Sequence, residues 1–214
     1  MKTGILFDLD GTLLDTLEDL LDATNVALAH FGCPARTLAE LRTFVGNGAR
    51  NQIRLSLPGK ADDPDLDEVL AFYKEYYSGH CQNKTAPYPG VLKALAELRE
   101  YPMAIVSNKP DAAVKTLCAQ YFPGIYALGE AADCPRKPAP DMVYKAMKEI
   151  GAEKCIYVGD SEVDVLTAQN AGVPCLSVLW GFRDREVLEG EGGQHFCQTA
   201  GELVALIREL SHGK

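Results

Sequence analysis

The chain has 214 residues, of which 47% are apolar, so it can bury one large core or a core domain with a smaller inserted domain. Its formal net charge of -9, with no run of basic residues, argues against binding to nucleic acid or anionic membranes, because both ligands call for clustered lysine and arginine. We therefore expect no nucleic-acid or membrane partner, and composition leaves a monomer and a homodimer equally open.

The cysteines and the N-terminus indicate a cellular compartment. Seven cysteines are scattered without a Cys-x-x-Cys pair, which favours reduced thiols over a disulfide framework. The first apolar run, Ile5–Phe7, is too short for a secretory signal, and no apolar segment reaches the length of a membrane span. We expect a cytoplasmic protein.

Short apolar runs that end in polar or glycine-containing turns predict the strands of a sheet. A longer stretch suited to a helix follows each run, and this alternation is typical of an α/β fold with a parallel sheet and crossover helices. The expected strands are Ile5–Phe7, Met103–Val106, Ile125–Leu128, Cys155–Val158 and Cys175–Leu179.

A different pattern separates the first expected strand from the second. Helical periodicity runs through Leu20–Phe31, Leu38–Phe44, Gln52–Leu57 and Leu66–Tyr77, with no convincing strand between them. The prolines and glycine of Thr85–Gly90 prevent the last helix from continuing. We expect residues 15–86 to form an inserted α-helical cap, and residues 1–14 and 87–214 to form the core domain.

Two carboxylates follow the first expected strand. Asp8 and Asp10 are two residues apart, so an extended backbone points both side chains the same way, and Gly11 permits a tight turn after them. Their repulsion is relieved by a shared proton or a divalent cation, and an oxygen-rich site of this kind suits Mg²⁺ better than zinc. The alternative is that both aspartates belong to a surface loop.

Other polar residues follow the later strands, where parallel sheets form their ligand sites. The hydroxyl of Ser107 and backbone amides near Asn108 are suited to phosphate oxygens, and Lys137 precedes a helix start marked by proline. Asp160 and Asp164 add a second acidic cluster. Taken singly, the same residues are also compatible with an ordinary turn, a solvated lysine and a helix N-cap.

Together these motifs resemble those of the haloacid dehalogenase superfamily. Asp8–Thr12 is similar to its first motif, Ser107 to its second, Lys137 to its third and Gly159–Asp164 to its fourth, so the similarity covers essentially the whole chain. The resemblance implies a Rossmann-like α/β core with a helical cap inserted just after the first motif. Asp10 favours phosphoryl transfer over dehalogenation, because the dehalogenases of the superfamily generally lack an aspartate there.

The resemblance also implies a role for each aspartate. Asp8 is expected to attack phosphorus, while Asp10 protonates the leaving oxygen and then deprotonates the attacking water. Asp8, the backbone carbonyl of Asp10 and Asp160 are expected to bind Mg²⁺, with Asp164 ligating or supporting it.

Three polar residues receive supporting roles from the same resemblance. Ser107, with nearby amides, is expected to hold phosphoryl oxygens. Lys137 is expected to orient Asp8 and to stabilise negative charge, and Thr12 to help position the Asp10 loop.

The expected cap contains a loop that bears on the substrate. Gly46, Asn47 and Gly48 lie in a segment that resembles the Val-Gly-Asn-Gly loop of phosphoglycolate phosphatases, and Pro87–Val91 and Trp180–Arg183 resemble that subgroup too. The hypothesis is a loop that closes over phosphoglycolate, with Arg50 as partner for the substrate carboxylate. An arginine on the helix surface is the alternative for Arg50.

The prediction is therefore a phosphoric monoester hydrolase acting on a small phosphorylated metabolite. Relatives that act on pyrophosphate, nucleotide or sugar phosphates, or as phosphomutases, share most of these core residues. A noncatalytic phospho-acceptor or interaction protein is the alternative of a different class.

Overall fold

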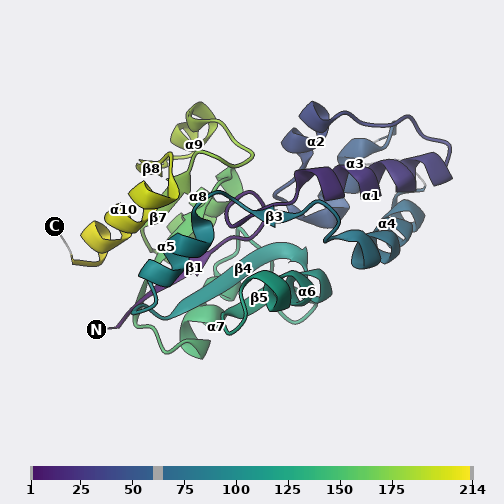
Figure 1. The fold of residues 1–214 in the computed structure, drawn as a ribbon. Coiled ribbons are helices and arrows are strands. Elements are labelled where there is room, and N and C mark those ends of the chain that lie inside the picture. The colour runs from purple at the N-terminus through teal and green to yellow at the C-terminus, as the bar shows by residue number, and fades with distance from the viewer. Residues whose placement is uncertain (1, 60–64, 213–214) are drawn as a thin grey trace.

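A computed structural model describes residues 2–59 and 65–212 and contains a six-stranded sheet in the order β5-β4-β1-β6-β7-β8 (Figure 1). Every neighbouring pair in this sheet is parallel. The predicted α/β fold with a parallel sheet is thus confirmed. The strands are β1 (Thr3–Phe7), β4 (Met103–Pro110), β5 (Tyr126–Glu130), β6 (Lys154–Gly159), β7 (Cys175–Val178) and β8 (His195–Cys197).

The first strand is buried on both faces, as a nearly continuous apolar run requires. Because side chains alternate along a strand, Leu6 packs into one apolar cluster, while Ile5 and Phe7 pack into a second cluster on the opposite face. Helices α7 (Asp141–Glu149) and α8 (Glu162–Ala171) contribute Met142 and Ala168 to the cluster of Leu6. The described helices of this part are α5 (Val91–Glu97), α6 (Asp111–Tyr121), α7 (Asp141–Glu149), α8 (Glu162–Ala171), α9 (Arg185–Gly190) and α10 (Ala200–His212).

All five predicted strands form, with two differences from the sequence pattern. β4 continues four residues past the predicted end at Val106, through the polar residues that approach the sheet edge. β8 has only three residues, too few to produce a recognisable apolar run, and the sequence did not predict it.

Apart from its loops, the described chain from Leu17 to His80 forms a helical segment, which lies to one side of the sheet in Figure 1. The short antiparallel strands β2 (Leu14–Asp15) and β3 (Ala86–Pro87) pair where the chain enters and leaves it. Asp19 holds the chain just before β3, because its carboxylate accepts hydrogen bonds from the backbone amides of Lys84 and Thr85 at 2.9–3.0 Å. The helices are α1 (Leu17–His30), α2 (Leu38–Phe44), α3 (Gly48–Ser56) and α4 (Leu66–His80). Within the described ranges, no helix has the length and apolar character needed to cross a membrane.

Candidate active site

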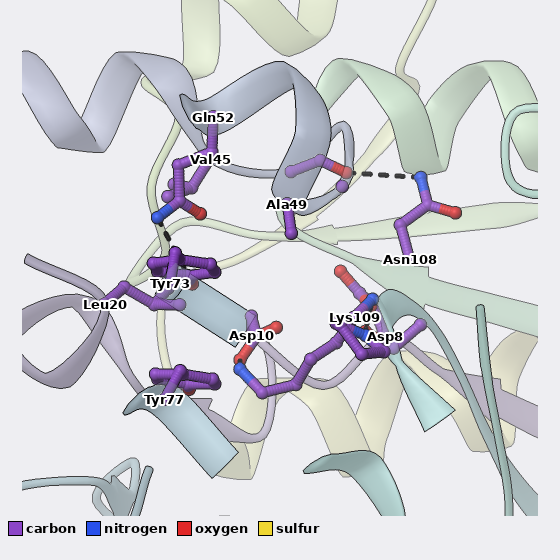
Figure 2. A pocket seen from close by; sticks show the side chains of 14 residues that line it. Asp8, Asp10, Leu20, Val45, Ala49, Gln52, Tyr73, Tyr77, Asn108 and Lys109 are labelled. Carbon is purple, nitrogen blue, oxygen red and sulfur yellow. Dashed lines mark hydrogen bonds and ion pairs between the residues drawn. The ribbon is translucent and has the colours of Figure 1, made fainter. Parts of the chain in front are cut away.

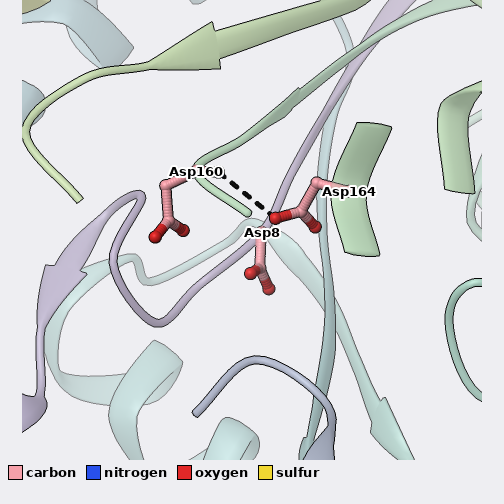
Figure 3. A group of neighbouring side chains, drawn as sticks. All are labelled: Asp8, Asp160 and Asp164. Carbon is pink, nitrogen blue, oxygen red and sulfur yellow. Dashed lines mark hydrogen bonds between the residues drawn. The ribbon is translucent and has the colours of Figure 1, made fainter. Parts of the chain in front are cut away.

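Three carboxylates meet at the carboxyl edge of the sheet, where β1 and β6 end side by side (Figure 3). Asp8 follows β1, Asp160 follows β6, and Asp164 lies in the first turn of α8. All three are buried, and one oxygen of each lies within 4.8 Å of the others. The acidic residues after two separate strands are thus brought together, as the parallel sheet led us to expect.

Asp164 also belongs to the cap of its own helix. Its carboxylate accepts hydrogen bonds from the Ser161 backbone amide at 3.0 Å and from the Ser161 hydroxyl at 2.7 Å. The sequence allowed either a helix cap or an acidic cluster here, and the structure combines them. The hydrogen bonds of this helix N-cap hold the Asp164 side chain in one orientation beside Asp160.

The cluster combines three carboxylates with one neighbouring cation, Lys137, so its fully ionised form is disfavoured. Burial raises the pKa of Asp8 to about 7, with Lys137 opposing the rise and Asp164 adding to it. Burial, and then the nearby carboxylates of Asp164 and Asp8, also raise the pKa of Asp160 well above its usual range. Closely spaced carboxylate oxygens fit a hard divalent cation, which would bind to them as its ligands and favour their ionised forms.

Lys137 is the cation that contacts this cluster. Its side chain is 1% exposed, and Nζ lies 2.9 Å from Oδ1 of Asp8 and 2.8 Å from Oδ1 of Asp164. Burial alone lowers the pKa of Lys137, but Asp164 and Asp8 outweigh it and raise the pKa well above the usual value. Lys137 is therefore charged and cross-links two of the carboxylates.

Tyr157 completes the contacts of Lys137 and was not foreseen. Its hydroxyl lies 3.0 Å from Lys137 Nζ and 3.2 Å from Asp164 Oδ1. The residue sits within an apolar strand, where a tyrosine is indistinguishable from an ordinary core aromatic. Its polar role depends on contacts between β6 and a loop 20 residues earlier, which no local pattern records.

Asp160 is held in place by the turn after β1 and by the backbone of Phe182. The Thr12 hydroxyl donates to Asp160 Oδ1 at 2.9 Å, and the backbone amide of Phe182 donates to Oδ2 at 2.8 Å. Gly11 has φ +83°, and a Cβ at this position would collide with the Asp160 carboxylate, so only glycine is accommodated here.

A cavity separates the sheet edge from the helical segment (Figure 2). Residues of both parts form its wall, and the predicted site residues among them are Asp8, Asp10, Ser107, Asn108, Gly46 and Gly48. The wall also includes Lys109, Pro110 and residues of α1, α3 and α4, namely Leu20, Ala49, Gln52, Tyr73 and Tyr77, with Val45 from the loop after α2.

Asp10 forms an ion pair with a buried lysine in the wall of this cavity. Lys109 Nζ lies 2.8 Å from Asp10 Oδ1, and the Lys109 side chain is only 2% exposed. The same ammonium lies 4.6 Å from the centroid of the Tyr77 ring, within range of a cation–π contact. Lys109 was not among the predicted site residues, although its position directly after Ser107 and Asn108 was the available signal.

Asn108 connects the sheet edge to the loop of residues 46–48, which we call the cap loop. Its Nδ2 donates to the Lys137 carbonyl at 3.0 Å and to the Gly46 carbonyl at 3.3 Å. Its Oδ1 is buried and has no hydrogen-bond partner among the described residues. Ser107 is also buried, and its hydroxyl accepts a hydrogen bond from the Lys109 amide at 3.3 Å.

The cap loop reaches the cavity only in part. Gly46 and Gly48 have φ values of +106° and +76° and line the cavity, whereas Asn47 is the N-cap residue of α3 and is not among the lining residues. Arg50 is not among them either: its side chain is 53% exposed and forms an ion pair with Asp67. The structure therefore does not bring Arg50 to the other site residues.

Arg183 joins the sheet edge to the helical segment. Its guanidinium donates to the carbonyls of Arg42 and Val45 at 2.6 and 2.7 Å, and it pairs with Glu162 at 2.6 Å. The two carbonyls lie at the C-terminal end of α2, where a helix leaves acceptors without internal partners. Phe182, its neighbour in the chain, holds Asp160 through its backbone amide, so this contact connects α2 to the acidic cluster.

An Arg183→Ala variant should loosen α2 without unfolding the sheet. It loses two hydrogen bonds from a charged donor, so we expect amide hydrogen exchange in residues 41–48 to accelerate at least about 10-fold. Arg185→Ala removes an exposed arginine of the same surface and should leave that exchange unchanged. Equal rates in wild type and Arg183→Ala would show that other contacts hold α2.

Comparison with known proteins identifies the class. Residues 5–178 match the family of haloacid dehalogenase-like hydrolases, and the chain belongs to this family. A phosphoglycolate phosphatase from Mesorhizobium japonicum is 35% identical, over 97% of this chain and 98% of that protein. Another from Rhodobacter capsulatus is 36% identical, over 86% and 87%.

The solved structures agree with the sequence comparison. A crystal structure from Lactobacillus delbrueckii subsp. bulgaricus, described as a candidate phosphoglycolate phosphatase, superposes with a TM-score of 0.89 at 36% identity, covering 97% of this chain and 99% of that one. The chain is therefore a phosphatase of the phosphoglycolate phosphatase-like subgroup, and the resemblance drawn from its motifs is confirmed.

Proposed function

We propose that this phosphatase hydrolyses 2-phosphoglycolate to glycolate and phosphate, with Mg²⁺ as cofactor and through a phosphoryl group carried on Asp8. The observation that carries the proposal is the cavity shared by Asp8 and Asp10, next to the acidic cluster and beneath the cap loop. The named activity of the relatives supports the choice of substrate. We further propose that the protein acts on a small phosphorylated metabolite in the cytoplasm, while a monomer and a homodimer stay equally open.

The metal would be held by Asp8, Asp160 and Asp164, together with the backbone carbonyl of Asp10. When bound, Mg²⁺ would offset the repulsion between these carboxylates and an anionic phosphoryl group. Lys137 contributes the remaining positive charge: it holds an oxygen of Asp8 at 2.9 Å and thereby orients the nucleophile.

The chemistry proceeds in two displacements at phosphorus. A carboxylate oxygen of Asp8 forms the new P–O bond as the bond to the glycolate oxygen breaks, and Asp10 supplies the proton for that leaving oxygen. Asp10 then takes a proton from water as the water attacks the phosphorus of the aspartyl phosphate, which releases phosphate and regenerates the Asp8 carboxylate.

Binding involves both sides of the cavity. Ser107 and the amides near Asn108 would hold phosphoryl oxygens, while Thr12 acts through its hydrogen bond to Asp160. We propose that residues 15–86 act as a cap on a core of residues 1–14 and 87–214. Closure of the cap excludes water that competes for the phosphoryl group and strengthens the electrostatic contacts inside.

An Asp10→Asn variant should keep the fold and lose turnover by about 10²- to 10⁴-fold, because an amide neither donates the proton to the leaving oxygen nor accepts one from water. The loss in the first step, in which Asp10 protonates the leaving oxygen, should be smaller for p-nitrophenyl phosphate, because its leaving group needs little protonation. Single-turnover measurement of p-nitrophenol release against phosphoglycolate cleavage checks this. Equal losses in that first step would contradict the assignment of Asp10 as general acid.

The function itself is tested by phosphate release from a panel of phosphoglycolate, pyrophosphate, nucleotide monophosphates and sugar phosphates, with Mg²⁺ or with EDTA. We expect phosphoglycolate to dominate, with release lost in EDTA and restored by excess Mg²⁺. Preference for another compound of the panel would keep the phosphatase chemistry and overturn phosphoglycolate as the substrate. Turnover unaffected by EDTA would contradict the cofactor.

A further inference from the structure

Lys109 is a buried cation whose purpose the reaction scheme leaves open. Among the described residues that line the cavity, it is the only one with a positive charge. Its side chain is 2% exposed, so the ammonium has little access to bulk water. A buried ammonium is costly unless anions or hydrogen-bond acceptors surround it, and Asp10 is one such anion.

The known contacts of Lys109 leave part of this ammonium unused. An ammonium has three N–H donors, and the ion pair with Asp10 at 2.8 Å uses one of them. The Tyr77 ring face lies 4.6 Å away and provides a weaker, less directional contact. Lys109 can therefore keep Asp10 and donate a further hydrogen bond to a ligand in the cavity.

The rest of the described wall offers an anion neutral donors but no second cation; the Tyr77 hydroxyl, for example, is buried and has no hydrogen-bond partner among the described residues. Leu20, Val45 and Ala49 are apolar, and the Gln52 amide nitrogen already donates to Thr24 at 2.9 Å. Arg50, one of whose two interpretations from the sequence was this task, is not among the residues that line the cavity. Figure 2 shows the Lys109 ammonium beside Asp10, within the ring of side chains drawn around the cavity.

We propose that Lys109 binds the second anionic group of the substrate, a carboxylate close to the phosphoryl group, and thereby determines specificity for phosphorylated hydroxy acids over neutral phosphate esters. The inference rests on the proposed function, since it identifies how the same site distinguishes its substrate. It differs from a role in holding Asp10, because a positioning role affects every substrate alike.

The experiment compares two esters in the wild type and in Lys109→Met, which keeps the length of the side chain and removes the charge. Phosphoglycolate carries a carboxylate, and 2-hydroxyethyl phosphate has a neutral hydroxymethyl group at the same place. We expect Lys109→Met to lower the ratio of their kcat/KM values by roughly 10- to 100-fold, the range for one hydrogen bond between charged groups. Lys93→Met, on an exposed face of α5, should leave the ratio unchanged.

Several results would separate the possibilities. Equal losses on both esters, with an unchanged ratio, would overturn the proposal and leave Lys109 as a positioning residue for Asp10. If another carboxylated ester proved the best wild-type substrate, phosphoglycolate would be overturned as the substrate. The proposed role of Lys109 would then be kept only if its variant lost selectivity for that other ester. A wild type without preference for any carboxylated ester would overturn both. A Lys109→Gln variant repeats the comparison if Lys109→Met does not fold.

Discussion

Replacing Asp8 by asparagine should reduce turnover by at least about 10⁴-fold while the protein stays folded. The amide is a poor nucleophile, so the step that forms the new P–O bond is lost rather than slowed by misplacement. The fold should tolerate the change, because Lys137 keeps its 2.8 Å ion pair with Asp164 and the change removes one of three crowded carboxylates. Steady-state phosphate release and circular dichroism check the two halves of this expectation.

The matched control for Asp8→Asn is Asp141→Asn, the same chemical change at an exposed residue of α7, which should leave turnover intact. A direct readout comes from quenching the wild type during turnover and reducing it with borohydride, which converts an aspartyl phosphate to homoserine. We expect peptide mass spectrometry to find homoserine at position 8. Homoserine at another aspartate, or none under conditions of rapid turnover, would contradict Asp8 as the nucleophile.

The acidic cluster was predictable from the sequence, because a parallel sheet brings the residues that follow neighbouring strands together. Asp8 and Asp160 each follow an apolar run, and parallel neighbouring strands present their carboxyl ends at one edge. Separation along the chain is then irrelevant: residues 152 positions apart become neighbours once β1 pairs with β6. Lys137 lies in a loop without periodicity; its place before a proline-marked helix start made it a candidate, and the family motif supplied its role.

Arg50 illustrates where a loop motif is a poor guide to a side chain. The buried face of α3 consists of Ala49, Gln52, Ile53 and Ser56, which follow the three- and four-residue spacing of a helix. Arg50 is one position after Ala49 and so points about 100° away from that face. The phase of the buried stripe, rather than proximity to the glycines, accounts for its exposure.

Lys109 and Arg183 were missed for a different reason: their partners are distant in sequence and have no pattern of their own. Lys109 meets Asp10 99 positions away, and Arg183 reaches carbonyls 138 and 141 positions away. Backbone carbonyls exist at every residue, so a sequence cannot indicate which one an arginine will bind. These contacts follow from how the helical segment docks on the sheet edge.

The largest effect on stability should come from Lys137→Met. Removing the ammonium leaves Asp8 and Asp164 buried beside each other without their shared cation, and breaking a buried ion pair in this way costs about 3–5 kcal/mol. We expect urea denaturation in metal-free buffer to show a loss of that order. Lys145→Met removes an exposed lysine paired with Asp133 and should leave the midpoint of urea denaturation nearly unchanged.

The same Lys137→Met variant also tests whether the acidic cluster binds a cation. A divalent ion among Asp8, Asp160 and Asp164 would replace part of the missing positive charge, so Mg²⁺ should restore more stability to the variant than it adds to the wild type. The comparison needs no catalytic turnover, which makes it independent of the substrate. Equal stabilisation of both proteins by Mg²⁺ would mean that the ion binds without relieving this repulsion, and it would place the metal away from the carboxylates that Lys137 contacts.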